Sequence, residues 1–559
     1  MIFYDFEVFK HDWLVVLKNT TNHETQQIVN DVEELVKYYE ANKEDIWVGF
    51  NSRHYDQWIL KGLICGFNPK EINDYIIINQ KPGWHFSSLL NKVQLYNYDI
   101  MTSMHSLKQL EGFMGNNIKE TTVPFNIDRK LTPEELQEVL QYCEHDVEQT
   151  MNVFINRSEE FTSHLSLITA FKLPLKYLNK TKAQLSAIIL KANKWVHNDE
   201  FDIKIPETIK LNKYKFIDTW YRDKSNLDYK KKLDVEVAGV PHTFAWGGLH
   251  GAIPNYIGEG LFLNVDVASY YPSLMIEYGF SSRNISDPGL YKEIYNTRLK
   301  LKAEKNPMQQ PYKIVLNSTY GAMKDKHNPL FDPLQANNVC VSGQLMLLDL
   351  IEKLEDHVQL IQSNTDGILV KLKRKQDLEK VKDICHEWEQ RTRMVLEYDL
   401  YTKVIQKDVN NYIIVDENGK YKSKGAYVKK LNSLDYDLPI VNEAIVNYFL
   451  TGKAPEETIN ECTELYKFQK VVKISSKYSK GLYGDEPLNE KVLRVFASRR
   501  RTDKGIFKIK AGGNKEKIAN TPEKCFIEND DVKGKPIPRR LDRWWYIELA
   551  HKRLNDFIS

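Results

Sequence analysis

Two carboxylates lie one residue apart in the apolar segment that opens the chain. Asp5 and Glu7 alternate with aromatic and aliphatic residues over residues 3–9, and side chains of a β-strand point to alternate faces. A strand here would place both carboxylates on one face, where they repel each other. Such a pair is tolerated when the face is open to water or when a divalent cation lies between the carboxylates. The segment therefore predicts a strand with a candidate metal site.

Two further acidic residues follow in the same part of the chain. Asp56 comes shortly after the apolar segment 46–50, in a loop at the end of a predicted strand, where functional sites are often built. Asp146 lies on a predicted helix, four residues after Tyr142 and on the same face. The start of that helix is marked by an N-cap, a proline at the first position and a capping box: Thr132, Pro133 and Glu135. Taken singly, each acid could be a surface residue or a helix cap.

A second pair of acids lies farther along the chain. Asp266 ends the apolar segment that begins at Leu261, and Asp366 lies in a tight turn, Asn364 to Gly367, between two apolar segments. The alternative for Asp266 is a turn residue that ends a buried strand. If the two strand ends are neighbours, the two carboxylates can hold the pair of metal ions that phosphoryl transfer uses.

Basic and polar side chains between these acids suit a nucleotide. Lys313, Asn317 and Tyr320 share one face of a predicted helix, where a lysine can meet a triphosphate and a ring can face a base pair. Arg298 and Lys302 are four residues apart on a preceding helix that ends near residues 306–307. An ordinary exposed basic helix would have the same pattern.

The composition is that of a globular protein with several domains. The 559 residues are 42 % hydrophobic and 28 % charged, and chains of this length divide into domains. We expect an intracellular protein, because no segment approaches the ~20 apolar residues of a membrane span and the N-terminus lacks a signal-peptide pattern. The scattered cysteines predict reduced core residues and no zinc site: Cys65, Cys143, Cys340, Cys385, Cys462 and Cys525.

A basic run near the C-terminus indicates a phosphate-binding face. Residues 491–517 contain ten lysines and arginines against two acids, although the net charge of the whole chain is only +2. The alternation over residues 505–510 predicts a strand with one basic face. The alternative is a solvated surface.

Together these motifs resemble those of family B DNA polymerases. DxE, Nx(3)YD and Yx(3)D around Asp5, Asp56 and Asp146 resemble the three exonuclease motifs of the proofreading domain. DxxSxYPS, Kx(3)NSxYG and a TDG turn resemble polymerase motifs A, B and C. The resemblance implies an α/β and α+β multidomain fold, with an RNase H-like exonuclease domain followed by a right-hand polymerase. It implies these domains: exonuclease 1–160, connecting region 161–254, palm 255–275 and 336–435, fingers 276–335 and thumb 436–559.

The resemblance also assigns roles to single residues. Catalytic and metal-binding roles, with Mg²⁺ or substituting Mn²⁺, fall to Asp5, Glu7, Asp56, Asp146, Asp266, Asp366 and the carbonyl of Val267, while Tyr142 would orient the attacking water. Nucleotide-binding roles fall to Tyr271, as the sugar-discriminating ring, Arg298, Lys302, Lys313, Asn317 and Tyr320. DNA-binding roles fall to Asn51, Ser106, Leu107, Gly247, Gly248, Tyr412, Arg499, Arg500 and Arg501.

Two departures from the family pattern are visible. Asn364 stands where motif C usually has an aspartate, and Asn410 stands where a lysine is commoner. The loss of a carboxylate at Asn364 removes a negative charge near the second acid pair and could weaken metal binding. Two rival functions are a dedicated exonuclease with a decayed polymerase region and a non-catalytic DNA-binding scaffold.

The resemblance implies partners and a setting. We expect primer-template DNA and deoxynucleoside triphosphates as substrates, no membrane, and a monomeric enzyme of phage or mobile-element type in the cytoplasm of its host. The segments 266–313 and 321–366 are short enough to exclude added subdomains. We therefore expect the enzyme to extend DNA or RNA primers without a terminal protein and to work with a helicase, primase or single-strand-binding protein.

Overall fold

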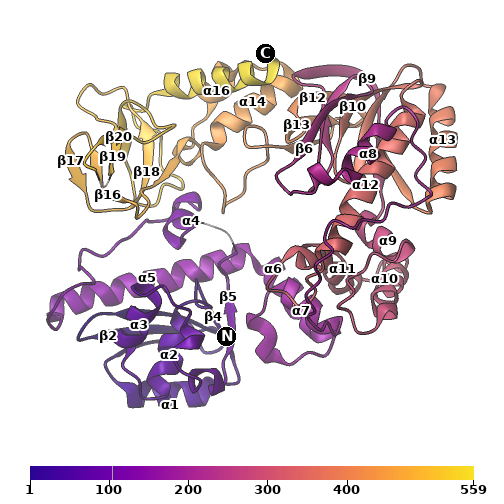
Figure 1. Ribbon diagram of the computed structural model, residues 1–559. Coiled ribbons are helices and arrows are strands. Elements are labelled where there is room, and N and C mark those ends of the chain that lie inside the picture. The colour runs from indigo at the N-terminus through magenta and orange to yellow at the C-terminus, as the bar shows by residue number, and fades with distance from the viewer. Residues whose placement is uncertain (103–104, 511) are drawn as a thin grey trace. The chain divides into compact units, whose positions relative to one another are not determined.

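The computed structural model describes residues 1–102, 105–510 and 512–559 and is a mixed α/β protein of several parts (Figure 1). Its described residues form two compact units. Unit 1 contains Met1–Lys180, Leu431–Ala444 and Lys453–Leu549, and unit 2 contains Thr181–Lys430, Ile445–Gly452 and Ala550–Ser559. Within the described ranges, unit 1 contains three sheets, unit 2 contains one, and each unit has its own candidate site.

The N-terminal part of unit 1 is built on a five-stranded sheet. Its order is β3-β2-β1-β4-β5, in which β1 pairs parallel with β4, β4 pairs parallel with β5, and the other pairs are antiparallel. The strands are β1 Ile2–Val8, β2 Trp13–Asn19, β3 Thr25–Val29, β4 Ile46–Gly49 and β5 Tyr96–Asp99. Along β1 every residue except Asp5 and Glu7 is buried. The predicted opening strand is confirmed.

Six α-helices of the described chain belong to the same N-terminal part of unit 1. They are α1 Val32–Asn42, α2 Asp56–Ile64, α3 Pro69–Ile77, α4 Leu107–Phe113, α5 Pro133–Asn156 and α6 Ser158–Ala170. The predicted start of α5 is confirmed, because Thr132 accepts a hydrogen bond from the backbone N–H of Glu135 and the Glu135 carboxylate accepts one from the N–H of Thr132. Helix α5 packs against β1 and β2, which brings its polar residues to the carboxylates of β1.

The C-terminal part of unit 1 contains two small sheets, with strand orders β15-β18-β21 and β17-β16-β19-β20. The strands are β15 Lys470–Lys473, β16 Tyr478–Tyr483, β17 Glu486–Leu488, β18 Val492–Ala497, β19 Ile506–Lys510, β20 Lys515–Lys517 and β21 Cys525–Ile527. The predicted strand over residues 505–510 is thus confirmed as β19. Helix α15 Pro455–Glu461 belongs to this region, whereas α14 Pro439–Thr451 and α16 Arg543–Ile558 each begin in unit 1 and end in unit 2.

Arg494 does not belong to a basic surface, as its place in the basic run suggested. Its side chain is 0 % exposed and donates hydrogen bonds to the backbone carbonyls of Gly112, Asn116 and Asp530. The guanidinium has five donors in a fixed fork and therefore satisfies several buried carbonyls at once. Arg494 ties α4 to β18 inside unit 1.

Unit 2 contains a nine-stranded sheet of order β14-β13-β12-β9-β11-β10-β8-β7-β6. The strands are β6 Lys232–Val237, β7 Val240–Ala245, β8 His250–Ala252, β9 Tyr256–Val267, β10 Val358–Ser363, β11 Gly367–Leu372, β12 Leu396–Asp408, β13 Asn411–Val415 and β14 Tyr421–Lys424. The predicted hairpin is confirmed, because β10 and β11 pair antiparallel on either side of the turn at residues 364–366.

The helices of unit 2 include those that the sequence indicated between the second pair of acids. They are α7 Lys182–Ile189, α8 Lys215–Arg222, α9 Tyr270–Glu277, α10 Pro288–Ala303, α11 Gln309–Lys324, α12 Pro333–Leu354 and α13 Asp377–Thr392. Helix α12 begins where Asp332 caps it and Pro333 occupies its first position. Its central turns are buried almost all round.

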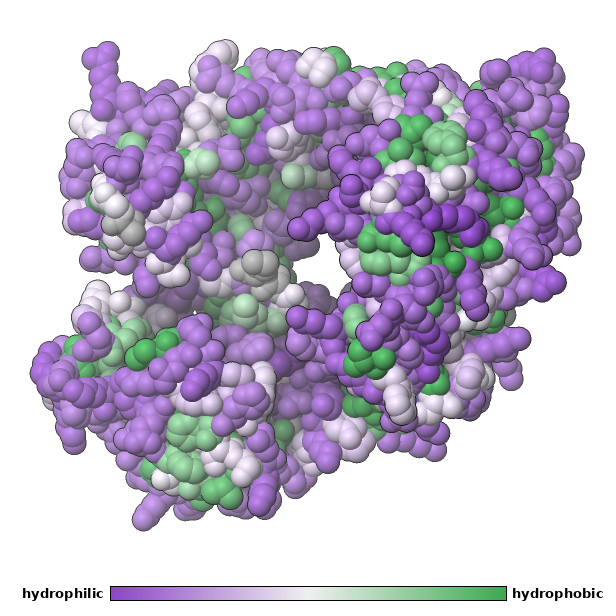
Figure 2. Space-filling view, viewed as in Figure 1, coloured by the Kyte–Doolittle hydropathy of each residue, from purple (hydrophilic) through white to green (hydrophobic). Residues whose placement is uncertain are grey.

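Hydrophilic residues cover most of the surface in view, and the apolar residues on it form scattered patches (Figure 2). Among the described residues, no helix is both long and apolar enough to cross a membrane. All six cysteines are unpaired, and four of them are buried.

Candidate functional site

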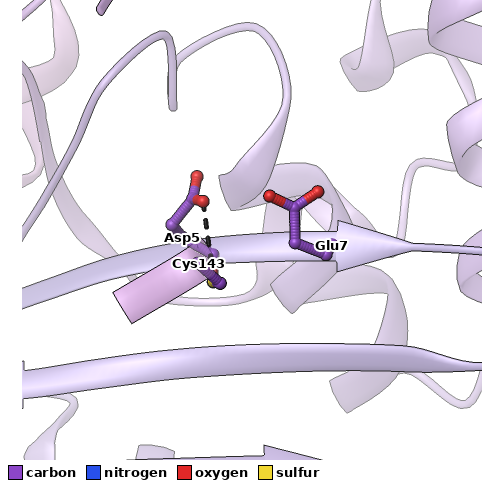
Figure 3. Close-up of side chains that lie close together, drawn as sticks. All are labelled: Asp5, Glu7 and Cys143. Carbon is purple, nitrogen blue, oxygen red and sulfur yellow. Dashed lines mark hydrogen bonds between the residues drawn. The ribbon is translucent and has the colours of Figure 1, made fainter. Parts of the chain in front are cut away.

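Four carboxylates meet on β1 of unit 1; we call Asp5, Glu7, Asp56 and Asp146 the unit 1 carboxylates. Asp5 and Glu7 project from the same side of β1 (Figure 3). The Asp5 carboxylate and backbone carbonyl lie 3.6 Å and 3.3 Å from Sγ of Cys143 on α5. One ligand atom each of Asp5, Glu7 and Cys143 lie within 4.8 Å of one another.

The other two carboxylates come from helices. Asp56 begins α2, and its Oδ1 accepts a hydrogen bond of 3.1 Å from the N–H of Phe6, the residue between Asp5 and Glu7. Asp146 lies on α5, which packs against β1. The structure thus gathers four acids that are up to 141 positions apart in the sequence.

Burial raises the pKa values of all four groups, and repulsion by the other unit 1 carboxylates adds to the shift at Asp5 and Glu7. The pKa of Asp5 is raised well above its ordinary value by burial first and by Asp56, Glu7 and Asp146 next, and that of Glu7 by burial, Asp146 and Asp56. Burial raises the pKa of Asp56 to about 7 and that of Asp146 to about 6. Crowded buried carboxylates of this kind call for a counter-charge.

Lys108 supplies part of that charge, and the sequence reasoning missed it. On α4, its ammonium forms ion pairs with Asp146 and, at 3.1 Å, with the fully buried Glu111. It also lies 4.6 Å from the ring centroid of Tyr142. Lys108 directly follows Ser106 and Leu107 in the sequence. Sequence spacing alone does not predict its contact with Asp146, which is 38 positions away.

The unit 1 carboxylates fit a hard divalent cation such as Mg²⁺. Carboxylate oxygens are the ligands this ion prefers, and the nearby thiol does not compete, because burial raises the pKa of Cys143 well above its ordinary value. A protonated thiol donates a hydrogen bond and does not ligate a metal. A metal ion here could activate water and stabilise a leaving oxygen in phosphodiester cleavage.

The proposed DNA contacts of unit 1 lie in the loop after β4 and at the start of α4. Asn51 has a positive φ of 61°, and its N–H donates to Asp99, which fixes the loop after β4. Ser106 caps α4 and forms a capping box with Gln109. Leu107 is the first residue of α4, next to Lys108.

In unit 2, Asp266 lies near the end of β9, and Asp366 lies in the turn directly before the adjoining strand β11; we call these two residues the hairpin carboxylates. Asp266 near the end of β9 pairs in register with Gly367, the first residue of β11. The carbonyl of Asp366 accepts a hydrogen bond of 2.8 Å from the N–H of Val267. A Cβ atom at Gly367 would lie 2.0 Å from Oδ1 of Asp266, so only glycine allows this approach.

Neighbouring carboxylates also make the electrostatic potential at Asp266 negative. The pKa of Asp266 is raised to about 6, first by burial and next by Asp366, while the side-chain amide of Asn264 opposes the shift through a hydrogen bond of 2.6 Å. A third acid, Asp399 on β12, raises it further, and its partner Lys422 lies 3.2 Å away. Sequence reasoning did not single out either residue. The turn itself is closed by a hydrogen bond from the N–H of Asn364 to the carbonyl of Gly367.

The candidate nucleotide-binding residues lie on α9, α10 and α11. The rings of Tyr271 and Tyr320 have centroids 4.4 Å apart. Arg298 is buried and donates a hydrogen bond of 2.7 Å to the hydroxyl of Ser269, which lies between Asp266 and Tyr271 in the sequence.

The remaining cations of this set are exposed. Lys302 on α10 forms an ion pair of 3.5 Å with Glu397 of β12, the residue that pairs in register with Asp266. Lys313 and Asn317 lie on an exposed strip of α11. Their side chains are therefore accessible to a ligand.

Gly247, Gly248 and Tyr412 lie near the hairpin turn. The carbonyl of Gly247 accepts a hydrogen bond of 2.8 Å from the thiol of Cys340, and a Cβ at Gly248 would lie 3.1 Å from Oγ1 of Thr365. Burial raises the pKa of the Tyr412 hydroxyl, with further contributions from Asp266 and Asp366. These residues, predicted from separate motifs, are therefore neighbours of the hairpin carboxylates.

Arginines form a basic surface in the C-terminal part of unit 1. Arg499, Arg500 and Arg501 are exposed, and the first two line a depression of about 290 Å³ with Arg539 and Arg540, which sequence reasoning did not select. The lysines of the basic run behave differently. Lys504, Lys508, Lys510, Lys515 and Lys517 all form ion pairs with nearby acids. The arginines therefore carry most of the available positive charge of this run.

Because the pKa values of the unit 1 carboxylates are raised, we expect the free energy of unfolding of the metal-free protein to fall as pH rises. An acid with a higher pKa in the folded chain binds more protons when folded, so the free energy of unfolding falls as pH rises through the unfolded value of about 4. For Asp56 and Asp146 the loss is complete above their folded-state values of about 7 and about 6. In chelator, we expect a lower unfolding midpoint at about pH 8 than at about pH 5. Mg²⁺ should raise the midpoint at the higher pH, by about 2–4 °C per kcal/mol.

The matched control removes two of the charges without changing the shape. Asp5→Asn combined with Glu7→Gln should unfold at a higher temperature than wild type at the higher pH in chelator, and added Mg²⁺ should then have little effect. Differential scanning calorimetry measures both midpoints. An equal Mg²⁺ shift in the variant and in wild type would contradict metal binding by these carboxylates.

Comparison with known proteins gives limited similarity. No family model matches the chain. The chain is 24 % identical over 245 residues to DNA polymerase 1 of Saccharolobus solfataricus, a match that covers 35 % of this chain and only 27 % of that protein. The solved structure of the family B DNA polymerase from Pyrobaculum calidifontis aligns with 100 % of this chain and 78 % of that chain, at 13 % identity and a TM-score of 0.46. Part of this chain is thus similar in sequence to an archaeal DNA polymerase.

Proposed function

We propose that the protein is a template-directed DNA polymerase with its own 3′→5′ proofreading exonuclease. The observation that carries the proposal is the pair of hairpin carboxylates, one at the end of β9 and one in the turn before β11, together with the packed rings of Tyr271 and Tyr320 and the exposed lysine and amide side chains of α11. A second, independent set of carboxylates in unit 1 supports the exonuclease. The partial sequence similarity to a DNA polymerase supports the polymerase part of the proposal.

In the polymerase, Asp266, Asp366 and the carbonyl of Val267 would hold Mg²⁺, which supplies activation of the primer 3′-hydroxyl and stabilisation of the pyrophosphate leaving group. Lys313 and Asn317 would bind the triphosphate from the exposed strip of α11. Arg298 is already oriented by its hydrogen bond to Ser269. These side chains align the incoming nucleotide with the primer end, and that positioning is a large part of phosphoryl-transfer catalysis.

In the exonuclease, the unit 1 carboxylates would hold Mg²⁺, which supplies an activated water and a stabilised leaving oxygen. Tyr142 orients that water, and the nearby ammonium of Lys108 holds Asp146 in position until a cation binds. Asn51, Ser106 and Leu107 would bind the single-stranded primer end. Cleavage at this site would remove a mispaired nucleotide from the primer end.

Two features indicate the expected partners: the arginine surface of unit 1 and the short segment between Asp266 and Lys313. Arg499, Arg500 and Arg501 would contact DNA phosphates. Between Asp266 and Lys313 the described chain contains only α9, α10 and the start of α11. We infer that the enzyme extends DNA or RNA primers and relies on a helicase or a single-strand-binding protein to pass duplex DNA. A phage or mobile element is the source we propose.

Templated incorporation tests this function against its rivals. With a primer-template of known next base and one nucleotide at a time, we expect Mg²⁺-dependent addition of the complementary nucleotide only. A dedicated exonuclease would shorten the primer and never lengthen it, and a DNA-binding scaffold would do neither. Either result with correctly folded protein would reject the polymerase assignment.

Tyr271 predicts how the sugar is selected. The ring packs against Tyr320 two positions after Ser269, where it would clash with a ribose 2′-hydroxyl. Tyr271→Ala should raise the ratio of ribonucleotide to deoxynucleotide kcat/KM by about tenfold or more, which corresponds to ~1.4 kcal/mol of lost discrimination. Tyr271→Phe keeps the ring and should keep the wild-type ratio. An unchanged ratio in Tyr271→Ala would show that another residue excludes ribose.

A further inference from the structure

A cavity of about 540 Å³ lies in unit 1 between α2, the chain that leads into β5, and the 3-10 helix Leu175–Asn179. Pockets of this size bind small ligands in many proteins. Its walls include apolar and aromatic side chains such as Trp58, Tyr96 and Tyr177. Neither of the two candidate carboxylate sites lines it.

The charged side chains in its wall all have one sign. Lys61, Lys92, Lys176 and Lys180 line the cavity, and none of its described lining residues is acidic. Within the described part of the chain, no carboxylate lies within salt-bridge distance of these four lysines. Four unpaired cations around one cavity favour an anionic ligand.

Lys61 is the strongest indication of a ligand. Its side chain is only 7 % exposed, and its Nζ lies 4.7 Å from the ring centroid of Trp58 on the preceding turn of α2. Burial lowers the pKa of the ammonium to about 8. A buried cation without a carboxylate partner destabilises a protein unless something else compensates the charge. An anion bound in the cavity would do so.

The aromatic residues of the cavity indicate which chemical group is joined to the anion. Trp58 is fixed by a hydrogen bond of 2.9 Å from its Nε1 to the carbonyl of Arg53. Tyr177 has the ammonium groups of Lys176 and Lys180 at 5.7 Å and 5.4 Å from its ring centroid. Aromatic rings next to lysines are suited to a planar base joined to a phosphate. We propose that this cavity binds a nucleoside monophosphate, with Lys61 on the phosphate.

Lys61 shares α2 with Asp56, one of the unit 1 carboxylates. Asp56 is the first residue of α2, and Lys61 follows five positions later, which is about 7.5 Å along a helix axis. A nucleoside monophosphate is also the product that the proposed exonuclease would release. Binding itself does not require that activity, so the two proposals can fail separately.

Equilibrium binding of dAMP to the full chain is the direct test. It is measured by calorimetry in chelator, so that metal-dependent binding at the carboxylate sites does not contribute. Lys61→Met should weaken dAMP binding by about tenfold or more. Lys37→Met removes an exposed lysine of α1 outside the cavity and should bind like wild type. Asp5→Ala with Glu7→Ala should also bind like wild type, which separates this cavity from the exonuclease site.

Folding of the key variant is checked by its unfolding midpoint. Methionine fills nearly the same volume without a charge, so Lys61→Met should be as stable as metal-free wild type or more stable. Undetectable dAMP binding to wild type, or equal binding to wild type and Lys61→Met, would overturn the proposal. Inorganic phosphate that bound as tightly as dAMP would overturn the role of the base.

Covalent trapping identifies the residue independently. Pyridoxal 5′-phosphate carries a ring, a phosphate and an aldehyde, which forms an imine with an unprotonated lysine amine and releases water. Borohydride then reduces the imine to a stable amine, and mass spectrometry locates it. We expect preferential labelling of Lys61, suppressed by dAMP but not by deoxyadenosine. Labelling spread evenly over surface lysines, without protection by dAMP, would contradict a site here.

Discussion

Asp366→Ala is expected to abolish primer extension while 3′→5′ degradation of single-stranded DNA persists. Asp366 lies beside Asp266 in unit 2, and the carboxylates of the proposed degradation site belong to unit 1. Loss of a metal ligand removes transition-state stabilisation of ~4 kcal/mol or more, which lowers the rate by about three orders of magnitude. Single-turnover incorporation of one nucleotide measures the loss.

A matched variant separates this effect from a general loss of charge. Asp383→Ala removes an exposed carboxylate of α13 in the same unit and should extend primers at the wild-type rate. If Asp366→Ala extended primers normally, or if it lost degradation as well with its unfolding midpoint unchanged, the assignment of Asp366 would be wrong.

Asp5→Ala combined with Glu7→Ala is expected to give the reverse result. Both side chains belong to the unit 1 carboxylates, whose raised pKa values reflect burial and mutual repulsion. Degradation of single-stranded DNA should fall by about three orders of magnitude, and extension should continue. Mispaired primer ends should then persist, because no site remains to remove them.

Time courses on a 5′-labelled single strand and on a mispaired primer-template measure both effects. Glu33→Ala removes an exposed acid of α1 and should degrade DNA like wild type. Degradation that continued in the double variant would show that another group of residues catalyses it.

Local patterns predicted much of the structure correctly. The strand that carries Asp5 and Glu7, the capped start of α5 and the β10–β11 hairpin are confirmed. Each depends on interactions between residues close in sequence: side-chain alternation, an N-cap with its capping box, and a tight turn. Sequence spacing therefore sufficed for them.

Contacts between distant segments could not be predicted in the same way. Lys108 meets Asp146 and Glu111 because α4 and α5 pack together, and Asp399 lies near Asp266 because β12 pairs with β9. The residues of the basic run likewise have different environments in the folded chain, because Arg494 is fully buried and five lysines form ion pairs with acids. Charge in a sequence does not reveal which cations remain free at the surface.

Nucleotide-dependent switching between primer growth and primer shortening tests the central claim most directly. Wild-type protein is incubated with a 5′-labelled primer-template, first in chelator and then with Mg²⁺, with and without the four deoxynucleoside triphosphates. We predict no change in chelator, longer products with Mg²⁺ and nucleotides, and shorter products with Mg²⁺ alone. A primer that never lengthens under any of these conditions, with protein that binds the DNA and is folded, would contradict the account.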